Sequence, residues 1–172
     1  METKKLSSKQ IDLLKKPLPK EAVSKHPTKT YLSSIKAIYV VERLNEVFGI
    51  GNWHLDSTHV NTTGKMVVVQ STFTAPDYNI RLQSYGGNDN TDLGDAYKGA
   101  TTDALTKIGS MLEIGMNVFK GLADAPPLPE LVKGTDKWDA VIKYLTEGGL
   151  ISEVEKKFYI PYELKNELLT IN

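Results

Sequence analysis

The sequence has no cysteine, only two arginines among its 172 residues, and no long hydrophobic run. Without cysteine, a disulfide scaffold, a thiolate zinc site and a cysteine nucleophile are excluded. No apolar stretch approaches the roughly 20 residues that a membrane-spanning helix needs. The charged start of the sequence, METKKLSSKQ, lacks the apolar segment of a secretory signal, so we expect no such signal.

The sequence also has a net charge of zero, because 21 basic residues balance 21 acidic ones. A nucleic-acid-binding surface is usually basic, so the balance taken alone argues against one. The charge is unevenly spread, however: residues 1–36 carry nine lysines and three acids, a net +6, whereas residues 37–124 carry −4 and residues 125–172 carry −2. The basic N-terminal segment either is a solvated terminus or binds phosphate groups without reading sequence.

Hydrophobic periodicity predicts an α+β fold. Helical spacing covers residues 32–48, strand-like runs follow at 53–61, Met66–Ala75 and 79–85, and a long helix is expected over 95–114. We therefore predict a helix, a three-stranded antiparallel β-meander and a long helix packed on the sheet, followed by a small C-terminal helical tail. The stretch 86–94 is expected to be a polar loop, and residues 8–16 a short helix.

The same reading divides the chain and predicts its buried positions. The expected segments are a basic N-terminal arm (1–30), an α+β core (31–122), a linker (123–135) and a small helical tail (136–172). The predicted buried stripe of the long helix is Tyr97, Ala100, Ala104, Leu105, Ile108, Met111 and Leu112. The predicted core of the tail is Trp138, Val141, Ile142, Leu145, Leu150, Ile151, Val154, Phe158 and Ile160.

Acidic residues before the long helix are the strongest candidates for a metal site. Together with Asp103, the residues Asp89, Asp92 and Asp95 would serve a metal-dependent nuclease. However, Asp92 and Asp95 also lie where a helix N-terminus favours negative charge. The segment 94–101 departs from the phosphate-loop pattern GxxxxGK[ST], because Ala100 occupies the lysine position. The three histidines share no ligand spacing. We therefore expect no catalytic residue, metal or cofactor.

One polar edge of the long helix has residues at four-residue spacing: Lys98, Thr102, Thr106 and Ser110. Lys107 lies roughly 180° around the helix from Lys98, so the two lysines cannot serve one flat surface. Asp103 stands four residues before Lys107, the favourable order for an intrahelical ion pair. Hydroxyls and lysines suit contact with phosphate. An ordinary solvated helix face would show the same pattern.

Two motifs resemble a known family. Residues 98–115 (KGATTDALTKIGSMLEIG) resemble the long-helix signature of the Rad-fifty-two-type single-strand DNA annealing proteins, especially their Sak-like phage and prophage members. Residues 44–53 (LNEVFGIGNW) resemble the motif that ends the first helix in that family. The order of helix, meander and long helix is similar, and the resemblance covers residues 31–121, slightly over half of the chain.

The resemblance implies a function. It implies ATP-independent binding of single-stranded DNA and annealing of complementary strands in homologous recombination and repair. It further implies a homo-oligomeric ring or filament, no cofactor, and a place in the cytoplasm of a bacterial host. Two alternatives remain open: a metal-dependent nuclease of a mobile element, and an oligomeric module that recruits a protein partner through the tail 136–172.

The family binds DNA in a groove lined by its first and long helices, and this implies which residues contact DNA here. The family's basic position on the first helix falls near Tyr39, with Lys36 and Arg43 one turn to either side. Its basic trio on the long helix falls on Thr106, Lys107 and Ser110, of which only Lys107 is charged. The expected DNA-binding residues are Lys36, Tyr39, Arg43, Lys65, Arg81, Lys98, Thr102, Thr106, Lys107 and Ser110.

Overall fold

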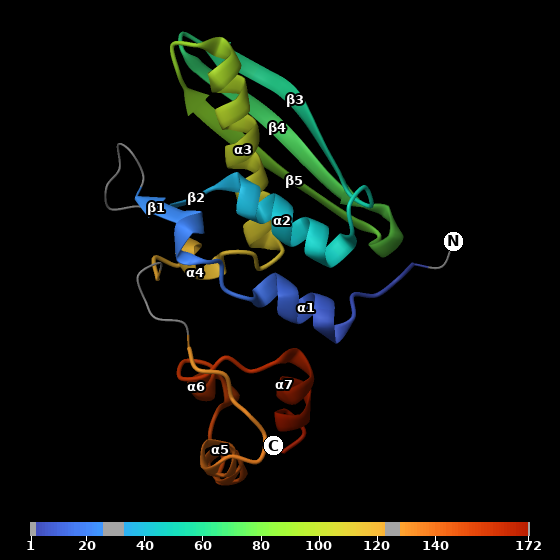
Figure 1. Cartoon of the computed structure of the whole chain (residues 1–172), viewed down its shortest axis with the longest axis vertical. Coiled ribbons are helices and arrows are strands. Elements are labelled where there is room, and N and C mark those ends of the chain that lie inside the picture. Colours follow the sequence, from blue (N-terminus) through green and yellow to red (C-terminus); the bar gives the residue numbers. More distant parts are fainter. Residues whose placement is uncertain (1–2, 26–32, 123–127, 172) are drawn as a thin grey trace. The chain divides into compact units, whose positions relative to one another are not determined.

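A computed structural model describes residues 3–25, 33–122 and 128–171 (Figure 1). The chain divides into two compact units, the N-terminal unit (residues 1–123) and the C-terminal unit (residues 124–172). Each unit has its own hydrophobic core. Within the described ranges, no helix has the length and apolar character that crossing a membrane requires.

The N-terminal unit is built on an antiparallel sheet in the order β3-β4-β5. Its strands are β3 (His54–Thr63), β4 (Met66–Ala75) and β5 (Ile80–Asp89). Alternate residues of β4 are buried, among them Val67, Val69 and Phe73, because one face of the sheet is covered and the other is not. The predicted three-stranded meander is therefore confirmed.

The long helix α3 (Leu93–Met111) lies along the covered face of the sheet (Figure 1). Small residues bring it close to the strands, since Ala96 and Ala100 pack on Val67 and Val69. Its buried positions are Ala96, Ala100, Ala104, Leu105, Ile108 and Gly109. The predicted burial of Tyr97 and Met111 is wrong, because the buried stripe runs through Ala96 instead. The two side chains are 40% and 53% exposed.

Strand β5 continues four residues past its predicted end, so the expected loop over 86–94 is wrong in its first half. Residues 86–89 pair with residues 66–69 of β4, and tertiary pairing overrides their low strand propensity. Gly86 lies directly under α3. A Cβ at Gly86 would stand 1.9 Å from the carbonyl oxygen of Ala100 and 2.5 Å from the amide nitrogen of Ala104. Glycine is therefore required for this contact between strand and helix.

Helix α2 (Ala37–Phe48) crosses α3 and completes the main core. Leu44 and Phe48 pack with Phe73 of β4 and Ile108 of α3. The crossing is close at Gly109, where a Cβ would stand 2.9 Å from a methyl group of Val40. These contacts fix the first turn of α2 beside the last turn of α3.

The helix predicted over 32–48 begins five residues late, at Ala37. Instead, β2 (Ser33–Ile35) pairs with β1 (Val23–Lys25), and Lys36 donates its N–H to Ala22 O at 2.8 Å. Serine has a low helix propensity, and pairing with β1 gives the backbone N–H and C=O groups of β2 hydrogen-bond partners outside a helix. A short helix, α4 (Met116–Phe119), follows the left-handed Gly115 and contacts β2.

The described part of the predicted basic arm packs on this core. Helix α1 (Ser8–Lys15) starts with a capping box between Ser7 and Gln10, and Leu14 is buried in the main core. The Gln10 side-chain amide donates to Val47 O at 2.6 Å and to the Tyr78 hydroxyl at 2.7 Å. The short helix predicted over 8–16 is confirmed to within one residue, and it is joined to α2 and the sheet.

The C-terminal unit is helical, as predicted. It comprises α5 (Asp136–Thr146), α6 (Ile151–Val154) and α7 (Tyr162–Leu168). Its buried residues are Leu131, Trp138, Val141, Leu145, Val154, Ile160 and Leu168. Leu131 stood in the expected linker, whereas Leu150, expected in the core, is 63% exposed because it precedes the first turn of α6.

Candidate nucleic-acid interface

A groove of about 580 Å³ opens in the N-terminal unit between β2, the start of α2, one side of α3, β5 and α4. It is lined by four of the ten expected DNA-binding residues, namely Lys36, Thr102, Thr106 and Lys107. The packing of α2 across α3 brings these residues together from separate parts of the sequence. This groove is our candidate site.

Lys36 lies at the start of α2, on the wall of the groove. Its side chain is exposed and has no ion-pair partner among the residues the structure describes. Helix α2 has neither a side-chain cap nor an acidic residue in its first turn. Its N-terminal partial positive charge is therefore uncompensated, and Ala37 and Ile38 of this turn line the groove.

The hydroxyl groups that α3 contributes donate to the backbone of their own helix. Thr102 donates to Lys98 O and Gly99 O, both at 3.0 Å, and Thr106 donates to Asp103 O at 2.9 Å. Such back-bonding is common for threonine inside a helix. A phosphate would have to replace these hydrogen bonds to accept from the hydroxyls, so the lysines are the stronger donors of the groove.

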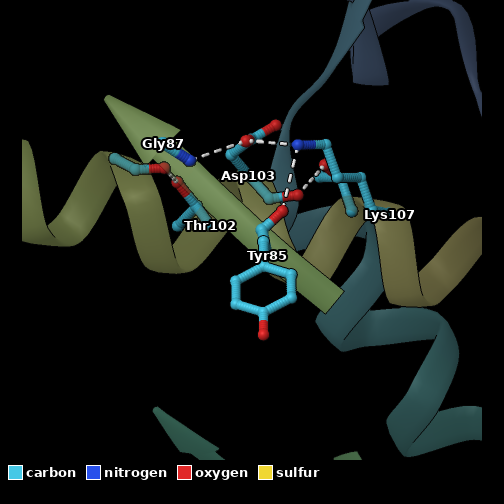
Figure 2. Close-up of polar contacts among 7 residues, drawn as sticks. Tyr85, Gly87, Thr102, Asp103 and Lys107 are labelled. Atoms are coloured by element: carbon cyan, nitrogen blue, oxygen red, sulfur yellow. Dashed lines mark hydrogen bonds and ion pairs between the residues drawn. The ribbon is translucent and has the colours of Figure 1, made fainter. Parts of the chain in front are cut away.

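An ion pair joins α3 to the outer edge of β5 (Figure 2). Lys107 Nζ is 2.8 Å from Asp103 Oδ2 and donates to Tyr85 O at 3.1 Å, while Asp103 Oδ2 also accepts the N–H of Gly87 at 3.0 Å. The predicted pairing of these two residues is confirmed. In addition, the hydrogen bonds of this pair occupy backbone groups at the edge of β5 that could otherwise pair with another strand.

The groove also has an apolar side. Ile38 of α2 and Phe119 of α4 both line it, and they are 58% and 48% exposed. Exposed apolar side chains beside a lysine suit a ligand that has both flat apolar parts and anionic parts. A single-stranded nucleic acid has this combination of bases and phosphates.

Six expected residues lie outside the groove lining, and five of them are exposed or half-buried. Lys65 is exposed at the β3–β4 turn, and Lys98 is exposed on α3 with its ammonium 4.0 Å from Asp95. Arg81 lies opposite Thr74, on the sheet face away from α3. Tyr39 is half-buried in α2, and Ser110 donates its hydroxyl to Lys107 O at 2.7 Å.

Arg43, also expected to contact DNA, is instead buried at 6% exposure. Its guanidinium donates to Leu13 O and to Lys16 O at the end of α1, and it lies 3.2 Å from a carboxylate oxygen of Glu46. Burial lowers the pKa of Arg43, and Glu46 partly opposes this effect. In this fold Arg43 holds α1 against α2 and leaves the groove to other cations. Periodicity alone could not reveal this, because a basic residue on a helix is usually solvated.

Asp92, one of the acidic residues that would serve a nuclease, has a structural role at the start of α3. Asp92 caps the helix by accepting the N–H of Asp95 at 2.9 Å. Across the described ranges, no group of three or more histidine, cysteine or acidic side chains is arranged to hold a metal ion. The nuclease alternative therefore gains no site from these residues.

Sequence reasoning missed a large part of the groove. Ser33 and Ser34 of β2, Asn88 of β5 and Phe119 of α4 all line it. The first two fell within a predicted helix and the third within a predicted loop. Phe119 lies in a short segment between Gly115 and Gly121 and shows no periodic pattern. These residues could be assigned to the groove only once the packing of β2 and α4 was known.

Comparison with known proteins adds no family assignment, since no protein-family model and no curated protein matches the sequence.

Proposed function

We propose that the N-terminal unit binds single-stranded DNA in the groove and that the protein anneals complementary strands without ATP. The supporting observation is that Lys36 and the uncapped start of α2 open onto the same groove as Lys107 and the hydroxyl-bearing side of α3. A helix N-terminus next to a lysine favours phosphate. The motif resemblance independently implies a DNA groove between these two helices.

In this proposal the groove holds the strand by its backbone. Phosphates approach Lys36 and the first turn of α2, and the bases lie toward Ile38 and Phe119. Contacts of this kind position a strand but do not read its sequence. Annealing then requires no bond making, because base pairing itself drives the reaction. The protein contributes by holding extended strands at high local concentration.

The homo-oligomeric ring or filament is also part of the proposal, and it is supported by the resemblance alone. Repetition around an assembly would turn a few lysines per subunit into a continuous track, so zero net charge is no obstacle. What matters to a phosphate is charge within a Debye length, about 8–10 Å. A role on DNA in recombination would place the protein in the cytoplasm of a bacterial host.

The test combines binding and annealing. Fluorescence anisotropy with a labelled oligo(dT) at low salt should detect binding that weakens steeply as salt rises. Lys36→Glu should weaken binding by about tenfold, because it places a carboxylate at the start of α2 beside the phosphate path. The matched control is Lys143→Glu on α5, whose parent ammonium is also well exposed and lies 4.0 Å from Glu147.

Annealing is followed as quenching between two complementary labelled strands, with and without ATP and a metal chelator. The proposal is supported if the protein raises the annealing rate above the protein-free rate and neither ATP nor the chelator changes that rate. A wild-type protein that binds no oligo(dT) at low salt would overturn it. Magnesium-dependent cleavage of the strand would favour the nuclease alternative instead.

A further inference from the structure

The groove contains a carboxylate that the proposed function does not explain. Among the lining residues, the charged ones are Lys36, Asp103 and Lys107. Asp103 would repel a phosphate, and it lies beside one of the two lysines. Its presence therefore affects how tightly the groove can hold a strand.

The geometry fixes this carboxylate in place. Asp103 Oδ2 accepts the backbone N–H of Gly87 at 3.0 Å and lies 2.8 Å from Lys107 Nζ. Lys107 is held in turn by Tyr85 O at 3.1 Å. Both partners are anchored to β5, and neither is buried, since their side chains are 38% and 43% exposed. The pair thus faces the groove as a neutral unit.

We infer that Asp103 limits the affinity of the groove for single-stranded nucleic acid by neutralising Lys107. Lys107 still presents a hydrogen-bond donor to a passing strand, because an ammonium has three N–H groups and two are engaged. Its charge is cancelled locally, however, so it releases few counterions when a phosphate approaches. Asp103 acts through Lys107 and is a positioning residue.

This inference rests on the proposed function and gives the carboxylate a purpose within it. A protein that only stored single strands would gain from two free lysines in each groove. A protein that anneals strands must also release the duplex, and overly tight binding would retain it. A neutralised lysine keeps each groove weak, while many grooves along an assembly still hold a strand together.

Asp103→Asn tests the inference directly. Asparagine keeps an oxygen that can accept the N–H of Gly87, but it removes the charge beside Lys107. At low salt, oligo(dT) should bind about three- to tenfold more tightly than to the wild type. The slope of log K against log[salt] should steepen by about 0.7 per groove, the value for one additional phosphate contact on a single strand. Release of annealed duplex should be slower.

Three further variants separate this effect from other causes. Asp56→Asn removes the same charge from an exposed position on β3 outside the groove lining, and it should leave affinity within about twofold. Lys107→Ala alone should weaken binding several-fold, because it leaves the Asp103 carboxylate unpaired in the groove. Asp103→Asn combined with Lys107→Ala should lose the whole gain.

The outcomes are distinct. If the wild type binds and Asp103→Asn keeps its melting temperature but binds equally or more weakly, Asp103 orients Lys107 for phosphate and the inference is wrong. Unchanged affinity of Lys107→Ala would also overturn it, whether or not Asp103→Asn folds, because an unpaired Asp103 carboxylate would then have no effect on the strand. If neither the wild type nor Asp103→Asn binds at low salt, the proposed function and the inference fail together.

Discussion

The two units of the protein use their charged residues differently. In the C-terminal unit, Lys133 and Lys156 lie 2.5 Å from Glu167 and Glu153, and Lys165 pairs with Glu155. In the N-terminal unit, Lys36 stands in a groove with no ion-pair partner among the described residues. The lysines of the small helical unit are thus largely balanced by its own carboxylates, whereas the groove exposes uncompensated positive charge.

The difference shows why overall charge is a poor guide to binding. Surface ion pairs such as those of the C-terminal unit contribute little to stability, but they do cancel local potential. A short, uncapped helix start with one lysine attracts an anion more strongly than several paired lysines do. We therefore expect any binding to reside in the N-terminal unit. Four changes distinguish the two units, two by their stability and two by their binding, from the largest expected effect to the smallest.

The largest expected effect comes from Gly86→Ala. The added Cβ would stand 1.9 Å from Ala100 O, so α3 must move off the sheet, at a cost of about 3 kcal/mol. Gly87→Ala is the matched control, because a Cβ on the next residue meets nothing closer than 3.6 Å. Trp53 reports on the N-terminal unit and Trp138 on the C-terminal unit, so single-tryptophan backgrounds can follow the two by fluorescence. Only the Trp53 transition should shift.

Arg43→Met should destabilise the same unit by about 2 kcal/mol. It leaves the carbonyls of Leu13 and Lys16 without their guanidinium partner at the contact between α1 and α2. Arg81→Met, at an exposed position, should change stability by less than about 0.5 kcal/mol. Chemical denaturation followed at Trp53 measures both. Equal stability of the two variants would mean that Arg43 does not hold α1 in place.

These two sites also show how far the sequence could be interpreted. The meander, the long helix and the helical tail were predictable, because alternation in β4 and the small-residue stripe of α3 are local patterns. The limits of β5 and α2 were not, because Gly86 and Ser33 take their conformation from pairing and packing with distant segments. For the same reason, the sequence suggested Lys36 and Lys107 for the groove but also the buried Arg43, and it missed Phe119.

Phe119→Ala addresses the groove without altering its charge. If bases stack on this ring, the loss should be about 1–3 kcal/mol of binding free energy per stacked base, with an unchanged salt slope. Phe119→Tyr should retain the affinity, since it keeps the aromatic face. Anisotropy titrations with oligo(dT) at several salt concentrations measure both quantities. A steepened or flattened slope would indicate that the change had disturbed the phosphate contacts instead.

The smallest expected effect is that of removing the C-terminal unit. Among the described residues, those that line the groove all belong to the N-terminal unit, and the main core of that unit includes none beyond Ile114. A chain ending at residue 123 should therefore bind oligo(dT) within about twofold of the full chain, because charges farther away than a Debye length are screened. Binding and annealing are measured side by side with the intact protein. A loss of more than tenfold would show that the tail contributes to the strand-binding surface, and the division of labour between the units would have to be abandoned. Retained binding with lost annealing would assign the tail to assembly of the subunits.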